Sequence, residues 1–184
     1  MNNKEQSLGE IISQFSDKFI AKQLQQTGKL PSVEHDDDWP SPCETGALDA
    51  DGFISWQPVK IDETFDFKNV EQALSLTIHP DVHQYFSQIY SEAIAATCSE
   101  GNLELLFAWN KADYERLQQN IIGHLMMKQK LKQKETIFFA VTDEDDINLV
   151  IKNDNGEVWV EPVGCEPSKF IANNLIEFIE NLEF

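Results

Sequence analysis

Two short turn sequences constrain the fold of this chain more than any other feature. Asn155-Gly156 separates the apolar segments 147–152 and 158–163, and Glu100-Gly101-Asn102 follows the apolar segment 93–98. Such sequences favour antiparallel hairpins, because glycine adopts the positive φ angles that tight turns between twisted strands require. The sequence therefore predicts antiparallel strand pairing and not the regular strand and helix alternation of a Rossmann fold.

Apolar residues at helical spacing predict two long helices. The first begins with the capping box of Ser7 and Glu10 and ends at Gly28. The second runs from about 113 to 132, with acids in its first turn and lysines near its last.

Shorter elements complete the predicted order. They are strands at 53–58, 103–109 and 136–141, helices at 70–76 and 80–89, and a closing helix marked by Ile171, Leu175, Phe178, Ile179 and Leu182. This order predicts an α+β fold in a single domain, 1–184, with a mainly antiparallel sheet flanked by helices. An irregular acidic loop is expected at about 30–51.

The charge of the chain limits its partners. With 14 Lys and Arg against 32 Asp and Glu, the formal net charge is −18. Nucleic acids and anionic membrane surfaces would repel such a protein, so we expect no nucleic-acid ligand and membrane association only through a protein partner. The first residues lack the pattern of a signal peptide and no segment is long and apolar enough to span a bilayer, which predicts a cytoplasmic location.

One short stretch, residues 34–43 (Glu-His-Asp-Asp-Asp-Trp-Pro-Ser-Pro-Cys), leaves three interpretations open: a metal site, a catalytic corner or a docking surface. Cys43 and His35 could form a thiolate and imidazole pair, but nearby carboxylates raise the pKa of a thiol, so a small packed cysteine is the favoured interpretation. The sequence contains three cysteines and no C-x-x-C motif, as expected for reduced thiols.

The histidines offer a second candidate metal site. His79 and His83 have the i, i+4 spacing of zinc ligands, although no third ligand is evident and both could instead hydrogen-bond near a helix start. His124 is expected to be partly buried and satisfied by a backbone carbonyl. We predict no catalytic residue, no metal and no cofactor.

The acidic residues are concentrated between Pro31 and Asp66, where Lys60 is the only base. Aromatic residues lie among these acids, namely Trp39, Trp56, Phe65 and Phe67. Aromatic anchors surrounded by charge are typical of a binding site for a basic partner, although acidic runs also serve as ordinary solvated surface. The predicted partner-binding residues are Glu34, Asp36, Asp37, Asp38, Trp39, Asp62, Glu63, Asp66, Asp143, Glu144, Asp145 and Asp146.

Several segments in the same order resemble the Syd family of bacterial SecY-interacting proteins. They are residues 40–43 (Pro-Ser-Pro-Cys), 56–58 (Trp-Gln-Pro), 120–125 (Asn-Ile-Ile-Gly-His-Leu), 155–158 (Asn-Gly-Glu-Val) and 172–175 (Ala-Asn-Asn-Leu). The resemblance implies a non-catalytic protein that docks through a concave acidic surface on SecY, the channel subunit of the secretion translocase. It further implies peripheral association with the inner membrane and a role in regulating or monitoring translocase assembly.

Two other functions remain open. The Syd family is similar in fold to the SUKH group of toxin-immunity proteins, so an alternative is an acidic protein that neutralises a basic toxin. A third hypothesis is a metal-dependent hydrolase that uses His79, His83 and nearby carboxylates.

Overall fold

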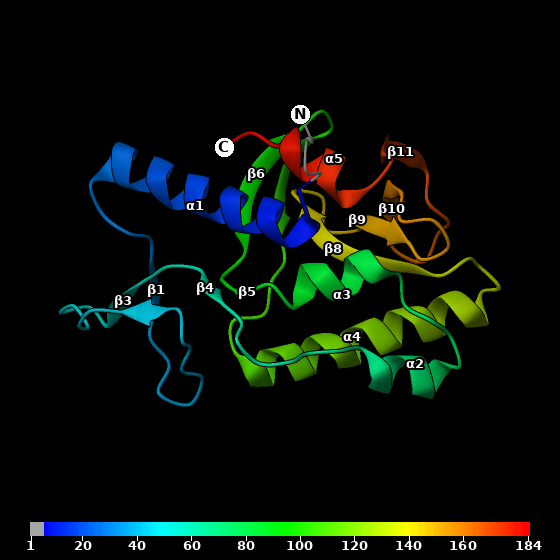
Figure 1. Ribbon diagram of the computed structural model, residues 1–184, viewed down its shortest axis with the longest axis horizontal. Coiled ribbons are helices and arrows are strands. Elements are labelled where there is room, and N and C mark those ends of the chain that lie inside the picture. Colours follow the sequence, from blue (N-terminus) through cyan, green and yellow to red (C-terminus); the bar gives the residue numbers. More distant parts are fainter. Residues whose placement is uncertain (1–5) are drawn as a thin grey trace.

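The computed structural model describes residues 6–184 and contains a curled antiparallel sheet with the strand order β11-β10-β9-β8-β7-β6 (Figure 1). Its strands are β6 (Ile94–Cys98), β7 (Gly101–Leu105), β8 (Thr136–Thr142), β9 (Ile147–Lys152), β10 (Val158–Pro162) and β11 (Lys169–Ala172). Every neighbouring pair in this sheet is antiparallel, so the predicted α+β class with a mainly antiparallel sheet is confirmed.

The helices are α1 (Leu8–Thr27), α2 (Lys68–Leu74), α3 (Pro80–Phe86), α4 (Lys111–Lys130) and α5 (Leu175–Glu180). Phe139 of β8 contacts Tyr85 of α3 and Phe178 of α5, while Phe138 contacts His124 of α4. Because successive side chains of a strand point to opposite faces, α3 and α5 cover one face of the sheet and α4 covers part of the other.

Two smaller sheets lie beside the main one. β1 (Ser32–Glu34), β3 (Phe53–Trp56) and β2 (Glu44–Thr45) form a three-stranded sheet, and β4 (Val59–Lys60) pairs with β5 (Ile89–Tyr90). The three-stranded sheet projects to one side of the molecule in Figure 1. Trp56 joins it to the core, since its ring lies 6.0 Å from the rings of both Phe19 and Trp109.

The predictions with local signals are confirmed. Ser7 and Glu10 form the capping box of α1, which ends at Gly28 with φ +71°. Both predicted hairpins are present, and Gly156 has φ +78° in the turn between β9 and β10.

The predictions of Ile171 and Leu182 in the closing helix are wrong, since α5 ends at Glu180. Residues Lys169–Ala172 form the edge strand β11, and α5 begins only at Leu175. The reason is the cap: the side chain of Asn174 accepts a hydrogen bond from the Glu177 N–H, which starts the helix four residues after Ile171. The segment 30–51, expected to be irregular, also contains the short strands β1 and β2.

No helix within residues 6–184 is long and apolar enough to cross a lipid bilayer.

A buried ion pair connects α4 to the sheet. The Lys128 ammonium is fully buried, lies 3.0 Å from Glu161 Oε2 and donates to the carbonyl of Cys165 at 2.8 Å. The Thr136 hydroxyl donates to both Glu161 oxygens at 2.9 and 3.0 Å. The pair is thus fully hydrogen-bonded, as buried charges must be.

We predict that Lys128→Ala destabilises the protein by about 3 kcal/mol, because it leaves the Glu161 carboxylate buried without its cation. The double variant Lys128→Met, Glu161→Leu should recover much of this loss, since it removes both charges. Urea unfolding monitored by circular dichroism would test this, and equal losses in the two variants would contradict the ion-pair explanation.

His124 lies beside the same pair. Its Nε2 is 3.1 Å from the Thr136 hydroxyl and 3.6 Å from Glu161, and the backbone of Thr136 is a further hydrogen-bond partner, so His124 has both the expected backbone contact and a hydroxyl contact. Burial lowers the pKa of His124 to about 4, and the Lys128 charge acts in the same direction.

This depressed pKa predicts a specific loss of stability in acid. Between about pH 6.5 and about pH 4 the unfolded histidine binds a proton that the native one does not, so the free energy of unfolding falls as the pH is lowered. From about pH 7 to about pH 5 the protein should lose about 2 kcal/mol more than His124→Gln. Parallel pH profiles for the two proteins would contradict the assignment.

Candidate functional site: an acidic groove

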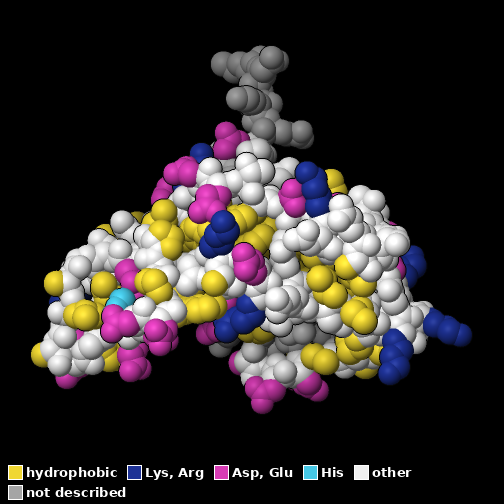
Figure 2. Space-filling view, turned by 90° about the horizontal axis from the view of Figure 1, so that it is seen from below, with side chains coloured by type: hydrophobic (Ala, Val, Ile, Leu, Met, Phe, Trp, Pro, Cys, Tyr) yellow, Lys and Arg dark blue, Asp and Glu magenta, His cyan; other side chains and the backbone are white. Residues whose placement is uncertain are grey.

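A groove of about 300 Å³ lies between the three-stranded sheet, the start of α4 and the ends of β6 and β7. Five carboxylates line it, and Arg116 is the only Lys or Arg among the described lining residues. The carboxylates are those of Glu34, Asp36, Glu44, Glu92 and Asp113, and the aromatic lining residues are Trp39, Phe107 and Trp109. In Figure 2, acidic side chains gather on the lobe at the left, beside the hollow that separates it from the rest of the molecule.

One wall is the loop before β2, which is fixed to the start of α4. The Asn110 side chain donates to the Pro40 carbonyl at 2.9 Å, and the Ser41 hydroxyl donates to the Trp109 carbonyl. The Trp39 N–H donates to the Asp36 carbonyl at 2.9 Å, which closes a tight turn. These bonds hold Trp39 and Asp36 in place at the groove.

His35 ties the two ends of this loop together. Its Nδ1 lies 2.9 Å from Glu44 Oε1 and its Nε2 lies 3.1 Å from Asp37 Oδ1. Hydrogen bonds to Glu44 and then Asp37 raise the pKa of His35, because both partners favour the protonated ring. Both ring nitrogens of His35 are therefore engaged with carboxylates, and no hydrogen bond within residues 6–184 joins His35 to Cys43.

The opposite wall is the first turn of α4. Asn110 is the N-cap and accepts from the Asp113 N–H at 2.8 Å, while Asp113 Oδ2 accepts from the Trp109 N–H at 2.9 Å. Asp113 Oδ1 also accepts from Arg116 at 2.7 Å, and the guanidinium lies 5.3 Å from the centre of the Trp39 ring. A guanidinium thus fits between an aromatic face and a carboxylate in this groove.

Glu92 lies in the groove just before β6. Its pKa is raised, first because the carboxylate is partly buried and then because Asp113 and Glu104 add negative charge nearby. Glu92 forms no ion pair with any Lys, Arg or His of residues 6–184. A cation from outside the chain would lower the pKa of Glu92 again, because it favours the ionised carboxylate.

The structure separates the predicted partner-binding residues into different places. Glu34, Asp36 and Trp39 line the groove, whereas Asp37 and Asp38 lie outside it. Glu63 pairs with Lys111 and Asp66 with Lys68, while Asp62 is an exposed residue on the same segment. Asp143, Glu144, Asp145 and Asp146 lie at the turn between β8 and β9.

Two of the predicted aromatic anchors belong to the core. Trp56 is 5% exposed and Phe67 is fully buried, so their interpretation as part of a docking surface is wrong. Phe65 stacks on Tyr114 with 4.2 Å between ring centres. In residues 62–67 the acidic side chains stay at the surface while the aromatic side chains pack inward. The numbers of acidic and aromatic residues in the sequence do not reveal this difference.

The histidines of the second candidate site have local partners. His79 is the N-cap of α3, where its ring accepts from the Asp81 N–H at 3.2 Å, and His83 Nε2 lies 3.5 Å from Glu71. Within residues 6–184 there is no group of three or more His, Cys, Asp or Glu side chains placed to hold a metal ion.

Sequence reasoning missed four charged groove residues: Glu44, Glu92, Asp113 and Arg116. Asp113 was interpreted only as a favourable charge at a helix start. Glu92 had a usable signal, since it is the only charged residue between Tyr90 and Cys98, in a segment otherwise made of small and apolar residues.

Comparison with known proteins agrees with this architecture. The family model described as "Syd protein (SUKH-2)" matches residues 9–183. The chain belongs to the Syd family. Among its Syd relatives, "Protein Syd" of Colwellia psychrerythraea is 48% identical, covering 99% of this chain and 95% of the relative. "Protein Syd" of Pseudoalteromonas atlantica is 43% identical with 96% of each chain covered, and that of Alteromonas mediterranea is 44% identical, covering 93% and 95%.

The thiols allow a test of this site description. Cys43 is 1% exposed and burial raises its pKa to about 11, while Cys165 is exposed. We predict that iodoacetamide at about pH 8 labels Cys165 in the native protein and labels Cys43 only after denaturation, because the reactive species is the thiolate. Mass spectrometry of tryptic peptides would measure this. Native labelling of Cys43 at the rate of Cys165 would contradict its packed, unreactive state.

Proposed function

We propose that this protein is a non-catalytic binding protein for the basic cytosolic loops of SecY, and that the acidic groove is its docking site. The observation that carries the proposal is the set of five groove carboxylates with Glu92 unpaired within the described chain. Membership of the Syd family, which the sequence resemblance describes as a family of SecY-interacting proteins, supports this choice of partner.

The chemistry of such loops suits the groove. Cytoplasmic loops of membrane proteins are rich in Lys and Arg under the positive-inside rule. A protein with a net charge of −18 attracts them and is repelled by anionic lipid, so its membrane association would come through the protein partner on the cytoplasmic side. This field speeds encounter and selects partners, and salt weakens it over a Debye length of about 8 Å.

Within the groove, different residues would supply charge and apolar contact. The Trp39 ring is only partly buried and its face already holds the Arg116 guanidinium, so it would offer apolar contact to the stem of a basic side chain. Glu92 supplies a partly desolvated carboxylate, whose interaction with a cation is stronger than that of a fully solvated acid. We infer that this binding regulates or monitors the assembly state of the translocase.

The test is equilibrium binding to nanodiscs that contain SecY, with empty anionic nanodiscs as the control. We predict salt-sensitive binding to the SecY discs and none to the empty discs. Glu92→Lys should weaken binding at least about tenfold, because it places a like charge against the basic loop. The double variant Asp145→Lys, Asp146→Lys changes the net charge more but lies outside the groove, so it should have a smaller effect.

Two results would contradict the proposal. Wild-type protein that binds neither disc would remove SecY as the partner and favour neutralisation of a basic toxin. A larger loss from the variant at residues 145–146 than from Glu92→Lys would place docking at the β8–β9 turn.

A further inference from the structure

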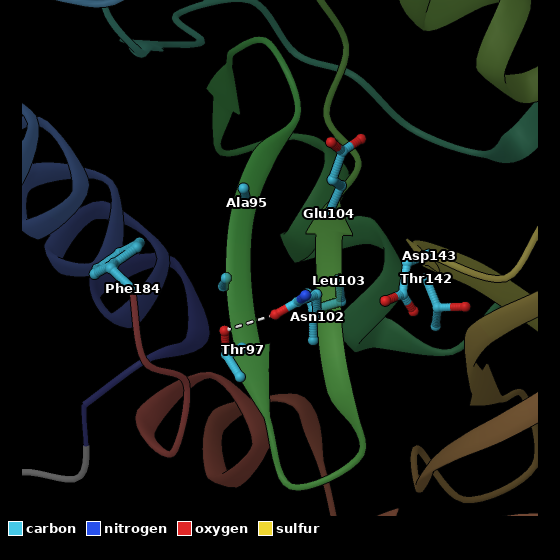
Figure 3. Close-up of a pocket in the computed structure, with 9 residues that line it drawn as sticks. Ala95, Thr97, Asn102, Leu103, Glu104, Thr142, Asp143 and Phe184 are labelled. Atoms are coloured by element: carbon cyan, nitrogen blue, oxygen red, sulfur yellow. Dashed lines mark hydrogen bonds between the residues drawn. The ribbon is translucent and has the colours of Figure 1, made fainter.

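A second hollow lies along the β6 and β7 hairpin. A cavity of about 370 Å³ is lined by Ala95 and Thr97 of β6, Asn102 and Glu104 of β7, and Phe184 (Figure 3). A smaller cavity of about 180 Å³ between α1 and β6 shares Ala95 and Phe184 with it. In Figure 3, Ala95 lies on β6 and Phe184 lies on the side of this strand that faces α1.

The edge of β6 is only partly occupied. The Thr97 N–H donates to the Glu183 carbonyl at 2.7 Å, and the Glu183 N–H donates to the Thr97 carbonyl at 2.9 Å, which is an antiparallel bridge. Main-chain groups two residues apart on a strand point the same way, so the N–H and C=O of Ala95 also point to this edge. No main-chain hydrogen bond outside the β6–β7 pairing reaches Ala95 within residues 6–184.

The groove and this edge are continuous along the chain. Ala93 lines the groove and Ala95, two residues further on, lines both cavities. Leu106 lines the groove and Glu104, two residues earlier on the neighbouring strand, lines the larger cavity. Ala93 and Leu106 lie one residue outside β6 and β7, so the groove ends where the hairpin begins, and an extended segment could pass from one hollow to the other.

The composition of this edge favours strand addition. β6 carries no charged residue, whereas exposed edges are commonly protected by lysine, proline or a covering segment. The larger cavity is lined by the carboxylates of Glu104 and Asp143 and by no Lys or Arg of the described chain. The smaller cavity at this edge also contains Lys22, which already donates to the main-chain oxygen of Phe184. Small side chains on β6 and the acids beside it fit an extended segment with basic side chains.

We propose that an extended basic segment of the partner leaves the acidic groove and adds as an antiparallel strand to the free edge of β6. Its main chain pairs with Ala95, and a basic side chain crosses the small Ala95 to reach Glu104, the residue opposite Ala95 on β7. Strand addition of this kind takes affinity from main-chain hydrogen bonds and specificity from alternate side chains. This inference rests on the proposed function, because one partner occupies both hollows.

The sharpest variant is Ala95→Pro. Proline removes the N–H that points to the edge and leaves the β6–β7 hydrogen bonds intact, and edge strands tolerate it. With SecY nanodiscs as the probe, Ala95→Pro should bind roughly tenfold more weakly, and the matched control Ala95→Ser should bind as the wild type does. Wild-type affinity of Ala95→Pro would overturn the proposal.

Glu92→Lys in the same assay separates the two hypotheses. If Glu92→Lys loses binding and Ala95→Pro keeps it, the groove is the docking site and strand addition is wrong. If both bind like the wild type, the groove itself is wrong and the strand proposal falls with it.

Amide hydrogen exchange provides a readout that does not depend on the folding of a variant. In the wild-type protein, the Ala95 amide should exchange quickly when free and slow at least about tenfold on SecY nanodiscs, because it gains a hydrogen-bond partner. The amides of β11, at the opposite edge of the sheet, should not change. Unchanged exchange at Ala95 in the complex would overturn strand addition.

Discussion

The first turn of α4 determines the shape of the candidate site. The Asp113 carboxylate accepts from the Trp109 N–H and pairs with Arg116, and the Asp113 N–H donates to the side-chain oxygen of the N-cap Asn110. Asn110 also holds the Pro40 carbonyl of the loop that follows β1. One helix start therefore joins the main sheet, the small sheet and the groove wall, and the carboxylates of the groove owe their proximity to it.

The features that the sequence predicted well are those with local causes. The capping box at Ser7 and Glu10 and the glycine turn at Gly156 act over a few residues, so their structures followed directly. Ile171 was wrongly predicted to be helical, because an apolar residue four positions before Leu175 is compatible with a helix and equally with a strand. The Asn174 cap decides between the two structures.

Only part of the groove could be predicted from the sequence, because its residues come from distant parts of the chain. Glu34, Asp36 and Trp39 belong to one acidic stretch and were identified, whereas Glu92 and Asp113 reach the same place from distant parts of the chain. Their proximity depends on the packing of Trp56 against Trp109, which no short window contains. Charge density along the sequence predicts a basic partner, whereas the position of the groove follows only from the tertiary fold.

The central claim is that the partner lies in the groove, and site-specific photocrosslinking tests it most directly. A benzophenone amino acid at Leu106, on the groove wall, would be compared with one at Phe170, which is 44% exposed on β11 at the other edge of the sheet. The account predicts crosslinks from position 106 to the cytosolic loops of SecY and none from position 170. Crosslinks from position 170 with none from position 106 would contradict it.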